Sequence, residues 1–340
     1  MHIRLVAALA AVLVLTLAGC SKKEVESRST ACDRDCIIEV TKTYLSALVA
    51  HDPGAAPLAE NVAFVENITR MKPGEGLWQS AVAGPSSFAI YVPDEKNQAA
   101  GFLGMMTYMA EPPTAPGAAA QKAEAPVEKT EQPVLVALRL KLEGGKITEA
   151  EHLLAGITGD METLRTPRPG LLTEVPEAER MDHAELVRIG ASYYDALDDN
   201  DGTLMPFAED CERHENGMVT AGANAGAGPN SAGTGKIARD CAGQLTSQVM
   251  SYIGPIVNRR VFAADPVTGL VMGLSHFRHP MDTPKYEVIN TDGTKAMFEM
   301  KFEPFDLPAA HVYKIGGDGK VHEIEASGFM APYNSPTGWE

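Results

Sequence analysis

Several side chains in the C-terminal half of the sequence have the types and spacing of acid/base groups. His214 and Glu215 are adjacent, and His276 and Arg278 stand two residues apart in a β-rich segment. Residues two apart on a strand project from the same face of the sheet. An imidazole beside a carboxylate can exchange protons near neutral pH, and an arginine can hold a carboxylate or an enolate of a ligand. These four residues are therefore candidate catalytic groups.

The same segment permits the opposite orientation. Ser275, Phe277 and His279 would then face a pocket, while His276 and Arg278 would lie on the outer face of the sheet or in a dimer contact. The sequence alone leaves both orientations open.

Metal and cofactor chemistry have little support in the sequence. His276, His279 and His311 could be taken for metal ligands, but their spacing matches no recognisable motif, and no metal is expected. The patterns G-x-S-x-G, H-E-x-x-H, G-x-G-x-x-G and G-x-x-x-x-G-K-[ST] do not occur, so the commonest hydrolase, metalloprotease and nucleotide sites are not predicted. We expect no cofactor.

The elements that would position these groups occur twice. Residues 44–67 align with 193–216 at an ungapped offset of 149, with nine identities in 24 positions. The shared residues are Tyr44, Ala47, Leu48, Asp52, Pro57, Ala59, Glu60, Glu66 and Asn67, which fall on Tyr193, Ala196, Leu197, Asp201, Pro206, Ala208, Glu209, Glu215 and Asn216. A repeat near 150 residues indicates two whole domains rather than a solenoid.

Each copy has the same predicted order of elements. An amphipathic helix comes first, a second short helical turn follows, and hairpin-linked strands complete the unit. The expected strands are near 87–92, 99–109, 133–142 and 146–154, and again near 257–264, 269–279, 296–302, 308–315 and 321–329. This order predicts an α+β fold with a mostly antiparallel sheet in each unit.

Comparison of the two copies separates shared from unshared polar residues. Glu66 and Glu215 occur in both copies, so they either stabilise the common fold or serve two equivalent sites. When the turn residues Asp94 and Asp265 are aligned, Met105 and Thr107 fall on His276 and Arg278, and Val65 falls on His214. Residues that are polar in one copy only are the better functional candidates. We also expect Glu66, Trp78 and Tyr252 to contact a ligand.

The first residues of the chain carry an export signal. Arg4 precedes an apolar run from Leu5 to Leu17, which is too short for a spanning helix, and Leu-Ala-Gly-Cys follows and resembles the bacterial lipobox. This pattern predicts a signal peptide at 1–19, an acylated Cys20 and a tether at 20–30. The expected location is the bacterial cell envelope, with the outer membrane favoured over the inner membrane, and the expected partner is the lipid membrane itself.

Cysteine usage and charge agree with export. The remaining cysteines are even in number, and their spacing suggests disulfides between Cys32 and Cys36 and between Cys211 and Cys241. A net charge of −16 without a long basic tract argues against nucleic acid as a partner.

The chain divides at two stretches of biased composition. Residues 111–132 are rich in Ala, Pro, Glu and Lys and are expected to form a flexible insertion in the first unit, at 31–160. A proline-rich linker at 161–181 precedes the second unit, at 182–340.

The element order and the strings Tyr44-Leu45-x-Ala47-Leu48, Gly74-Glu75-Gly76-Leu77-Trp78 and Pro206-Phe207-Ala208-x-Asp210-Cys211 resemble secreted tandem proteins of the NTF2-like, SnoaL-like cone fold. The resemblance implies two cones, each with N-terminal helices packed on a curved sheet around a pocket. It leaves function open, because this fold hosts isomerases, dehydratases, cyclases and plain binding domains.

Two hypotheses follow. One is a lipoprotein that binds a small apolar or mixed-polarity molecule, with a possible homodimer through the sheet faces. The other is a cofactor-independent lyase, isomerase or hydratase in the second unit.

Overall fold

The computed structural model describes residues 31–111, 128–225 and 236–340, and each half of this chain begins with one long helix. Helix α1 (Arg34–Val49) is capped by Asp33, whose carboxylate accepts a hydrogen bond from the third residue of the helix. Helix α4 (His183–Asp198) is capped in the same way by Asp182. An acidic cap satisfies a free N–H of the first turn. Both helices therefore begin where the sequence provides an N-cap.

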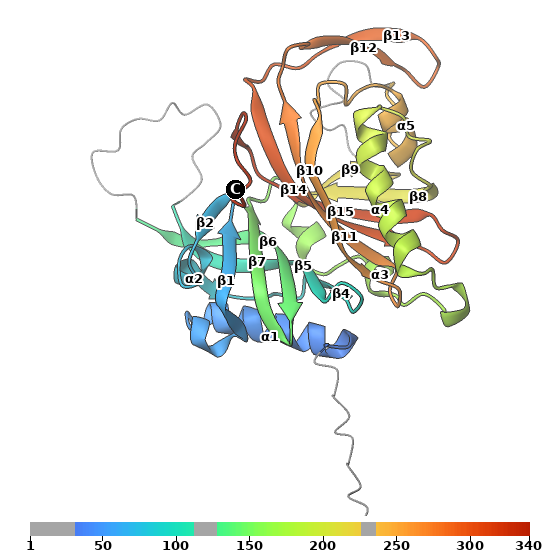
Figure 1. The fold of residues 1–340 in the computed structure, drawn as a ribbon. Coiled ribbons are helices and arrows are strands. Elements are labelled where there is room, and N and C mark those ends of the chain that lie inside the picture. Colours follow the sequence, from blue (N-terminus) through green and yellow to red (C-terminus); the bar gives the residue numbers. More distant parts are fainter. Residues whose placement is uncertain (1–30, 112–127, 226–235) are drawn as a thin grey trace, which may run out of the picture. The chain divides into compact units, whose positions relative to one another are not determined.

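Strands make up most of the remaining structure (Figure 1). The first unit contains η1 (Pro53–Ala55), β1 (Leu58–Glu66), β2 (Thr69–Met71), α2 (Leu77–Ser80), β3 (Ala81–Ala83), β4 (Ala89–Asp94), β5 (Ala99–Ala110), β6 (Thr130–Glu143) and β7 (Lys146–Ala155). Between the units lie η2 (Met161–Leu164), α3 (Pro169–Leu172) and η3 (Glu177–Glu179). The second unit contains β8 (Phe207–Glu215), β9 (Met218–Ala221), α5 (Cys241–Thr246), β10 (Ile256–Asp265), β11 (Leu270–His279), β12 (Lys285–Ile289), β13 (Lys295–Glu299), β14 (Phe305–Ile315), β15 (Val321–Gly328) and β16 (Ala331–Pro332).

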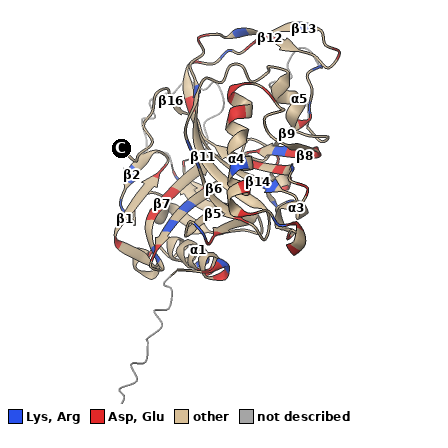
Figure 2. Cartoon of the chain, turned by 45° about the vertical axis from the view of Figure 1, so that its right-hand side comes forward, with Lys and Arg blue, Asp and Glu red and all other residues tan. Residues whose placement is uncertain are grey.

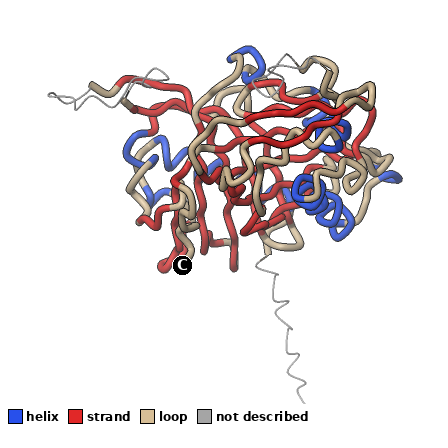
Figure 3. Tube along the Cα trace, turned by 90° about the horizontal axis from the view of Figure 1, so that it is seen from above, coloured by secondary structure: helices blue, strands red, loops and turns tan. Residues whose placement is uncertain are grey.

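The two main sheets repeat one topology. The first has the order β2-β1-β7-β6-β5, with β3 and β4 both paired to β5, and the second has the order β9-β8-β15-β14-β11-β10. In each sheet one pair is parallel, β1 with β7 and β8 with β15, and the other pairs are antiparallel. The helices lie outside the strands (Figure 3). The fold is α+β with two tandem cones of mostly antiparallel sheet, as the sequence predicts.

The outer faces of the two sheets pack against each other. Their apolar side chains form one shared core, to which β4 and β5 contribute Val92 and Leu103, and β11 and β14 contribute Met272 and Val312. All four are buried to within about 1% exposure. Gly101 lies so close to this contact that a Cβ atom there would come within 2.7 Å of the Met272 sulfur. This contact occupies the sheet faces through which the sequence suggested a homodimer.

Two buried aspartates at equivalent turns close this contact from both sides. Asp94 lies 2.7 Å from His183 Nε2, at the start of α4, and accepts a hydrogen bond from the Ala264 N–H. Asp265 accepts hydrogen bonds from Nε and Nη2 of Arg34, at the start of α1. Because Arg34 and His183 are related by the same offset of 149, each unit gives its turn carboxylate to the first helix of the other. Reciprocal contacts of this kind are typical of a two-fold dimer interface.

Basic and acidic residues both occur along the strands of the sheets, in blue and red in Figure 2. Arg139 on β6 pairs with Glu149 and Glu151 on β7, and Arg260 of the second unit forms two hydrogen bonds to Glu151. These carboxylates therefore have cationic partners, and one of the ion pairs also joins the units.

The structure differs from the predicted elements at several points. Strands β1 and β8 follow the first helices, where the sequence predicted only a short helical turn. The sequence did not reveal them, because each pairs in parallel with a strand distant in the chain and neither shows a clear alternation of apolar and polar residues. Glu66 is the last residue of β1. Strand β6 begins at Thr130, inside the segment predicted as an insertion, and β13 forms a separate hairpin with β12.

Several predictions fall outside the described residues. They are the signal peptide at 1–19, the acylated Cys20 and the tether at 20–30, together with most of the insertion, at 112–127. No helix in the described part of the chain is long and apolar enough to cross a membrane.

The turn aspartates generate a stability prediction. The Asp94→Ala variant should lower the free energy of unfolding by about 3 kcal/mol, because it leaves the Ala264 N–H and His183 without their buried acceptor. Chemical denaturation measures this directly. Asp35→Ala is the matched control, since the Asp35 side chain is 91% exposed and should change stability by less than about 0.5 kcal/mol. Equal effects of the two variants would contradict the role given to Asp94.

Candidate functional site

The second unit contains a cavity between its helices and the concave face of its sheet. Its volume is about 340 Å³, and its wall is mostly apolar, with a few polar groups. Small-molecule sites usually have this composition. The polar and aromatic lining includes Tyr193, Arg213, Glu215, Thr220, Arg239, Gln244, Tyr252, Phe277, His279, His311 and Ser327.

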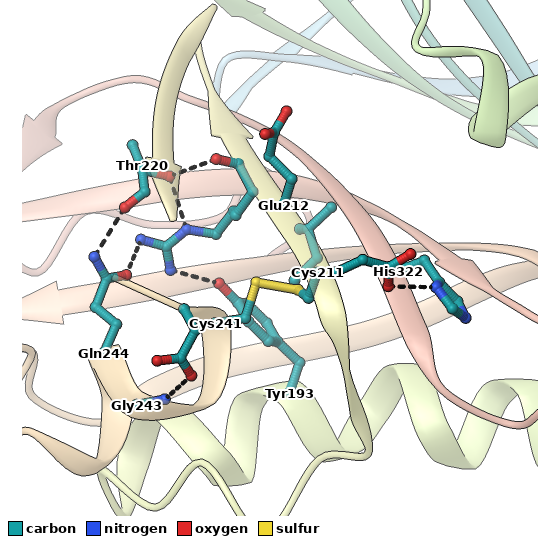
Figure 4. Close-up of a disulfide and its surroundings, with 12 residues drawn as sticks. Tyr193, Cys211, Glu212, Thr220, Cys241, Gly243, Gln244 and His322 are labelled. Carbon is teal, nitrogen blue, oxygen red and sulfur yellow. Dashed lines mark hydrogen bonds and ion pairs between the residues drawn. A yellow bond between two sulfur atoms is a disulfide. The ribbon is translucent and has the colours of Figure 1, made fainter. Parts of the chain in front are cut away.

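A disulfide fixes one side of this cavity. Cys211 on β8 is bonded to Cys241, the first residue of α5, as Figure 4 shows. The bond holds α5 against the strand that carries Arg213 and Glu215. The other predicted disulfide, between Cys32 and Cys36, is also present. Both predicted pairings are confirmed.

Arg213 is the buried cation of the cavity, with 7% of its surface exposed. Its Nε donates to Thr220 Oγ1 at 2.9 Å, Nη1 donates to the Tyr193 hydroxyl at 3.1 Å, and Nη2 donates to Gln244 Oε1 at 2.9 Å. Figure 4 shows the bonds that Tyr193, Thr220 and Gln244 receive. All three acceptors are uncharged. Burial opposes the charged form of Arg213, yet nearby Tyr193 and Glu215 outweigh it and raise its pKa.

Glu215 lies two residues further along the same strand and lines the same cavity. Within the described residues its carboxylate makes no hydrogen bond and no ion pair, although its negative charge helps to raise the pKa of Arg213. A carboxylate without a committed partner in an apolar cavity is available to a ligand, either as an acceptor or as a base.

Two histidines of the wall are neutral at pH 7. Burial lowers the pKa of His279 to about 4, and burial together with the charge of Arg213 lowers the pKa of His311 to about 3. His279 stacks on Phe305 at 4.1 Å between ring centroids. Among described residues, His311 Nδ1 has no hydrogen-bond partner.

The four predicted catalytic residues lie on opposite faces of the sheet. Glu215 faces the cavity, but His214, His276 and Arg278 do not line it. His214 Nε2 lies 2.8 Å from Glu212, and Arg278 donates to Asp306 at 2.8 Å. The structure therefore does not bring the four predicted groups together and places His214, His276 and Arg278 outside this cavity. Alternation along a strand points them to the other face and leaves Phe277 and His279 inside.

His276 is buried on the outer face of the sheet. It is 2% exposed beside the contact between the sheets, and within the described chain neither of its ring nitrogens has a hydrogen-bond partner. Because His276 and His279 point to opposite faces, they cannot bind one metal with His311. The described residues contain no group of three metal-ligating side chains.

The first unit has filled the equivalent space. Tyr44 Oη lies 2.7 Å from His152 Nε2, and His152 Nδ1 lies 3.0 Å from Glu66 Oε2. The Leu77 N–H donates to both oxygens of Glu66, and Trp78, 1% exposed, packs on Tyr44. Glu66 and Trp78 are therefore core residues, and the prediction that they contact a ligand is not supported.

Sheet register explains why one cone is filled and the other is open. Glu66 is paired with His152 on the neighbouring strand, whereas Glu215 is paired with Ala326. At the offset of 149, Phe64 of the first cone corresponds to Arg213 of the second. Because Ala326 has no imidazole, Glu215 lacks the partner that His152 provides to Glu66, and space remains beside it.

The sequence prediction missed Arg213 and His152, considered His311 only as a metal ligand, and included Tyr252, which does line the cavity. Arg213 carried a usable signal, because the repeat alignment places it on Phe64 and it is polar in one copy only. His152 lies outside the aligned segments. Its role depends on a strand pairing that the sequence did not reveal.

Comparison with known proteins adds little about activity. A family model described as "Domain of unknown function (DUF8021)" matches residues 179–328, less than half of the chain. No curated protein sequence matches significantly.

Several solved structures resemble single cones. Two are described as "putative polyketide cyclase": one from Xanthomonas campestris pv. campestris, with 14% identity and a TM-score of 0.28 over 35% of this chain and 90% of its own, and one from Silicibacter sp., with 15% identity and a TM-score of 0.28 over 44% and 92%. AusH from Aspergillus nidulans has 10% identity and a TM-score of 0.27 over 38% and 89%. The chain is a tandem α+β double-cone protein, and this assignment rests on its own strand order.

The two cavity histidines predict a pH dependence of stability. Because the folded pKa of His311 is lowered to about 3, the unfolded chain binds a proton between about pH 6 and 4 that the folded chain does not. Stability should therefore fall as the pH falls through this range, by about 1.4 kcal/mol per pH unit for this residue. In urea denaturation, His311→Phe should make the decline shallower by about that amount. The control His51→Asn, at an exposed turn, should leave the slope unchanged. Parallel curves for wild type and His311→Phe would contradict the burial argument.

Proposed function

We propose that the second cone binds a small molecule with a largely apolar body and at least one polar group, and that the first cone is its structural partner. The observation that carries this proposal is the difference between two equivalent positions. Glu66 is fully engaged in a filled core, whereas Glu215 lines a cavity of about 340 Å³ without a committed partner.

The cavity wall is suited to such a ligand. Leu197, Val249, Ile253 and Leu307 offer apolar contact, and Phe277 adds an aromatic face. Burial of apolar ligand surface would supply most of the affinity, while the few polar groups would fix orientation.

We also propose that the chain is held on a membrane by diacylation of Cys20, in the bacterial cell envelope and with the outer membrane favoured. The apolar run from Leu5 to Leu17 and the Leu-Ala-Gly-Cys sequence support this. Acyl chains would anchor the double cone at the lipid surface.

An acid/base enzyme is the second candidate function, and free Glu215 is the observation that favours it. An isomerase, lyase or hydratase needs a base that can remove a proton from carbon, and a cation that stabilises the resulting enolate. Glu215 and Arg213 would have these roles in place of His214 and His276. The Glu215→Gln variant should lower turnover of any substrate found by about 100-fold or more while binding persists. Unchanged turnover in Glu215→Gln would exclude this candidate.

A cavity-filling substitution tests the binding function. Ala326→His places an imidazole where the first cone has His152, within the cavity and opposite Glu215. Small molecules retained by the purified full chain are released and quantified by mass spectrometry. We expect at least a tenfold loss of retained ligand in Ala326→His, with stability within about 1 kcal/mol of wild type, because the new ring occupies existing space.

The matched control is Ala178→His, which adds the same side chain at an exposed position of η3. It should retain the ligand at wild-type level. Equal retention by Ala326→His and wild type would show that any bound molecule lies elsewhere and would refute the proposal.

A further inference from the structure

The charged groups of the second cavity do not balance. Its lining contains two guanidinium groups, from Arg213 and Arg239, and one carboxylate, from Glu215. The remaining titratable side chains are tyrosines and the two histidines, and burial keeps His279 and His311 neutral at pH 7. Residues 226–235, which follow the lining residue Ala225, include no charged residue by sequence. The cavity therefore has a net positive charge in a chain whose net charge is −16.

Arg213 also retains unused donors. A guanidinium group carries five N–H bonds in a planar fork, and the described structure uses three of them, one on each nitrogen. One N–H remains on each of Nη1 and Nη2, and the residue is part of the cavity wall. A pair of terminal N–H groups matches the two oxygens of a carboxylate.

The neutral partners hold this fork in place without neutralising it. Tyr193, Thr220 and Gln244 belong to three different elements and fix the guanidinium by hydrogen bonds. Within the described residues Arg213 makes no ion pair, although the charge of Glu215, two residues away on β8, acts on it. Arg239 is an exposed lining residue, and within the described part of the chain its guanidinium donates to the Ala225 carbonyl. A buried cation without an ion-pair partner favours a ligand that brings the missing charge.

We infer that the second cavity selects a monocarboxylate with an apolar body, whose carboxylate binds the Arg213 fork and whose body lies along Phe277, Val249 and Leu307. This inference rests on the proposed binding function and specifies its ligand class. Glu215, two residues from Arg213 on the same face, disfavours a second negative charge and favours a hydrogen-bond donor on the ligand. Arg239 increases the attraction at the entrance.

Matched pairs of acids and amides test the charge requirement. The probes are 2-naphthoate with 2-naphthamide and cinnamate with cinnamamide, titrated calorimetrically into the full chain in mild detergent. The members of each pair share shape and differ in charge. We expect the acids to bind about ten- to a hundredfold more tightly than the amides, the usual benefit of charged over neutral hydrogen bonds.

Three variants assign that preference to residues. Arg213→Gln should abolish the preference for acids. Glu215→Gln should strengthen binding of acids severalfold, because it removes a like charge, and should not strengthen binding of the amides, which carry no charge. Arg239→Gln should weaken binding of acids severalfold and, being exposed, should not disturb folding. Arg188→Gln, on the exposed face of α4 and outside the lining, is the control and should change nothing.

The outcomes separate this inference from the proposed function. Equal affinity for acid and amide in each pair would overturn the carboxylate assignment while the cavity remains a binding site. Unchanged acid affinity in both Glu215→Gln and Arg239→Gln would overturn it as well, even if Arg213→Gln failed to fold. If no probe of either class bound, both the inference and the binding function would be contradicted.

Discussion

The contact between the outer faces of the two sheets is the constraint on which the remaining arrangement depends. It buries apolar side chains from both units in one core and is closed on each side by a turn aspartate, Asp94 or Asp265, that binds the first helix of the other unit. Since outer-facing residues are committed to this packing or to ion pairs around it, chemistry within the cones is restricted to inward-facing positions. The strand period of two then determines which members of a polar cluster can reach a ligand. His276 therefore cannot reach a ligand in the cavity, whereas Glu215 can.

Duplication followed by divergence of a few inward positions accounts for the difference between the cones. In the first cone Glu66 accepts from the Leu77 N–H and contacts His152, which in turn contacts Tyr44, and Trp78 and Phe64 occupy the remaining space. In the second cone Ala326 and Arg213 stand at the positions of His152 and Phe64. A smaller side chain at Ala326 and a charge at Arg213 therefore distinguish the second cone, with its cavity, from the filled first cone.

The sequence was sufficient to predict the features that follow from local residue patterns and from the internal repeat. The repeat predicted two units, the hydrophobic pattern predicted an amphipathic helix at the start of each unit, and cysteine spacing predicted both disulfides. Asn67 binds the main chain of Leu154 on β7 and Asn216 binds the main chain of Gly328 on β15, which agrees with a structural role for this shared pair.

The predicted site failed where three-dimensional information was needed. A polar residue present in one copy only indicates divergence, but it does not say which face of a strand it occupies. His276 and Arg278 are polar in one copy only, but they point away from the cavity. Arg213 is also polar in one copy only and does face the cavity, yet it was not predicted. The parallel pairing of β1 with β7, which brings His152 to Glu66, joins segments that no local pattern connects.

Diffraction from a xenon-pressurised crystal of the full chain tests most directly the claim that one cone is open and the other filled, because xenon enters apolar cavities without needing a specific ligand. The account predicts xenon density in the second cone, between Phe277, Val249 and Leu307, and none among Tyr44, Phe64 and Trp78 of the first. Equal occupancy of both cones, or density in the first alone, would contradict it.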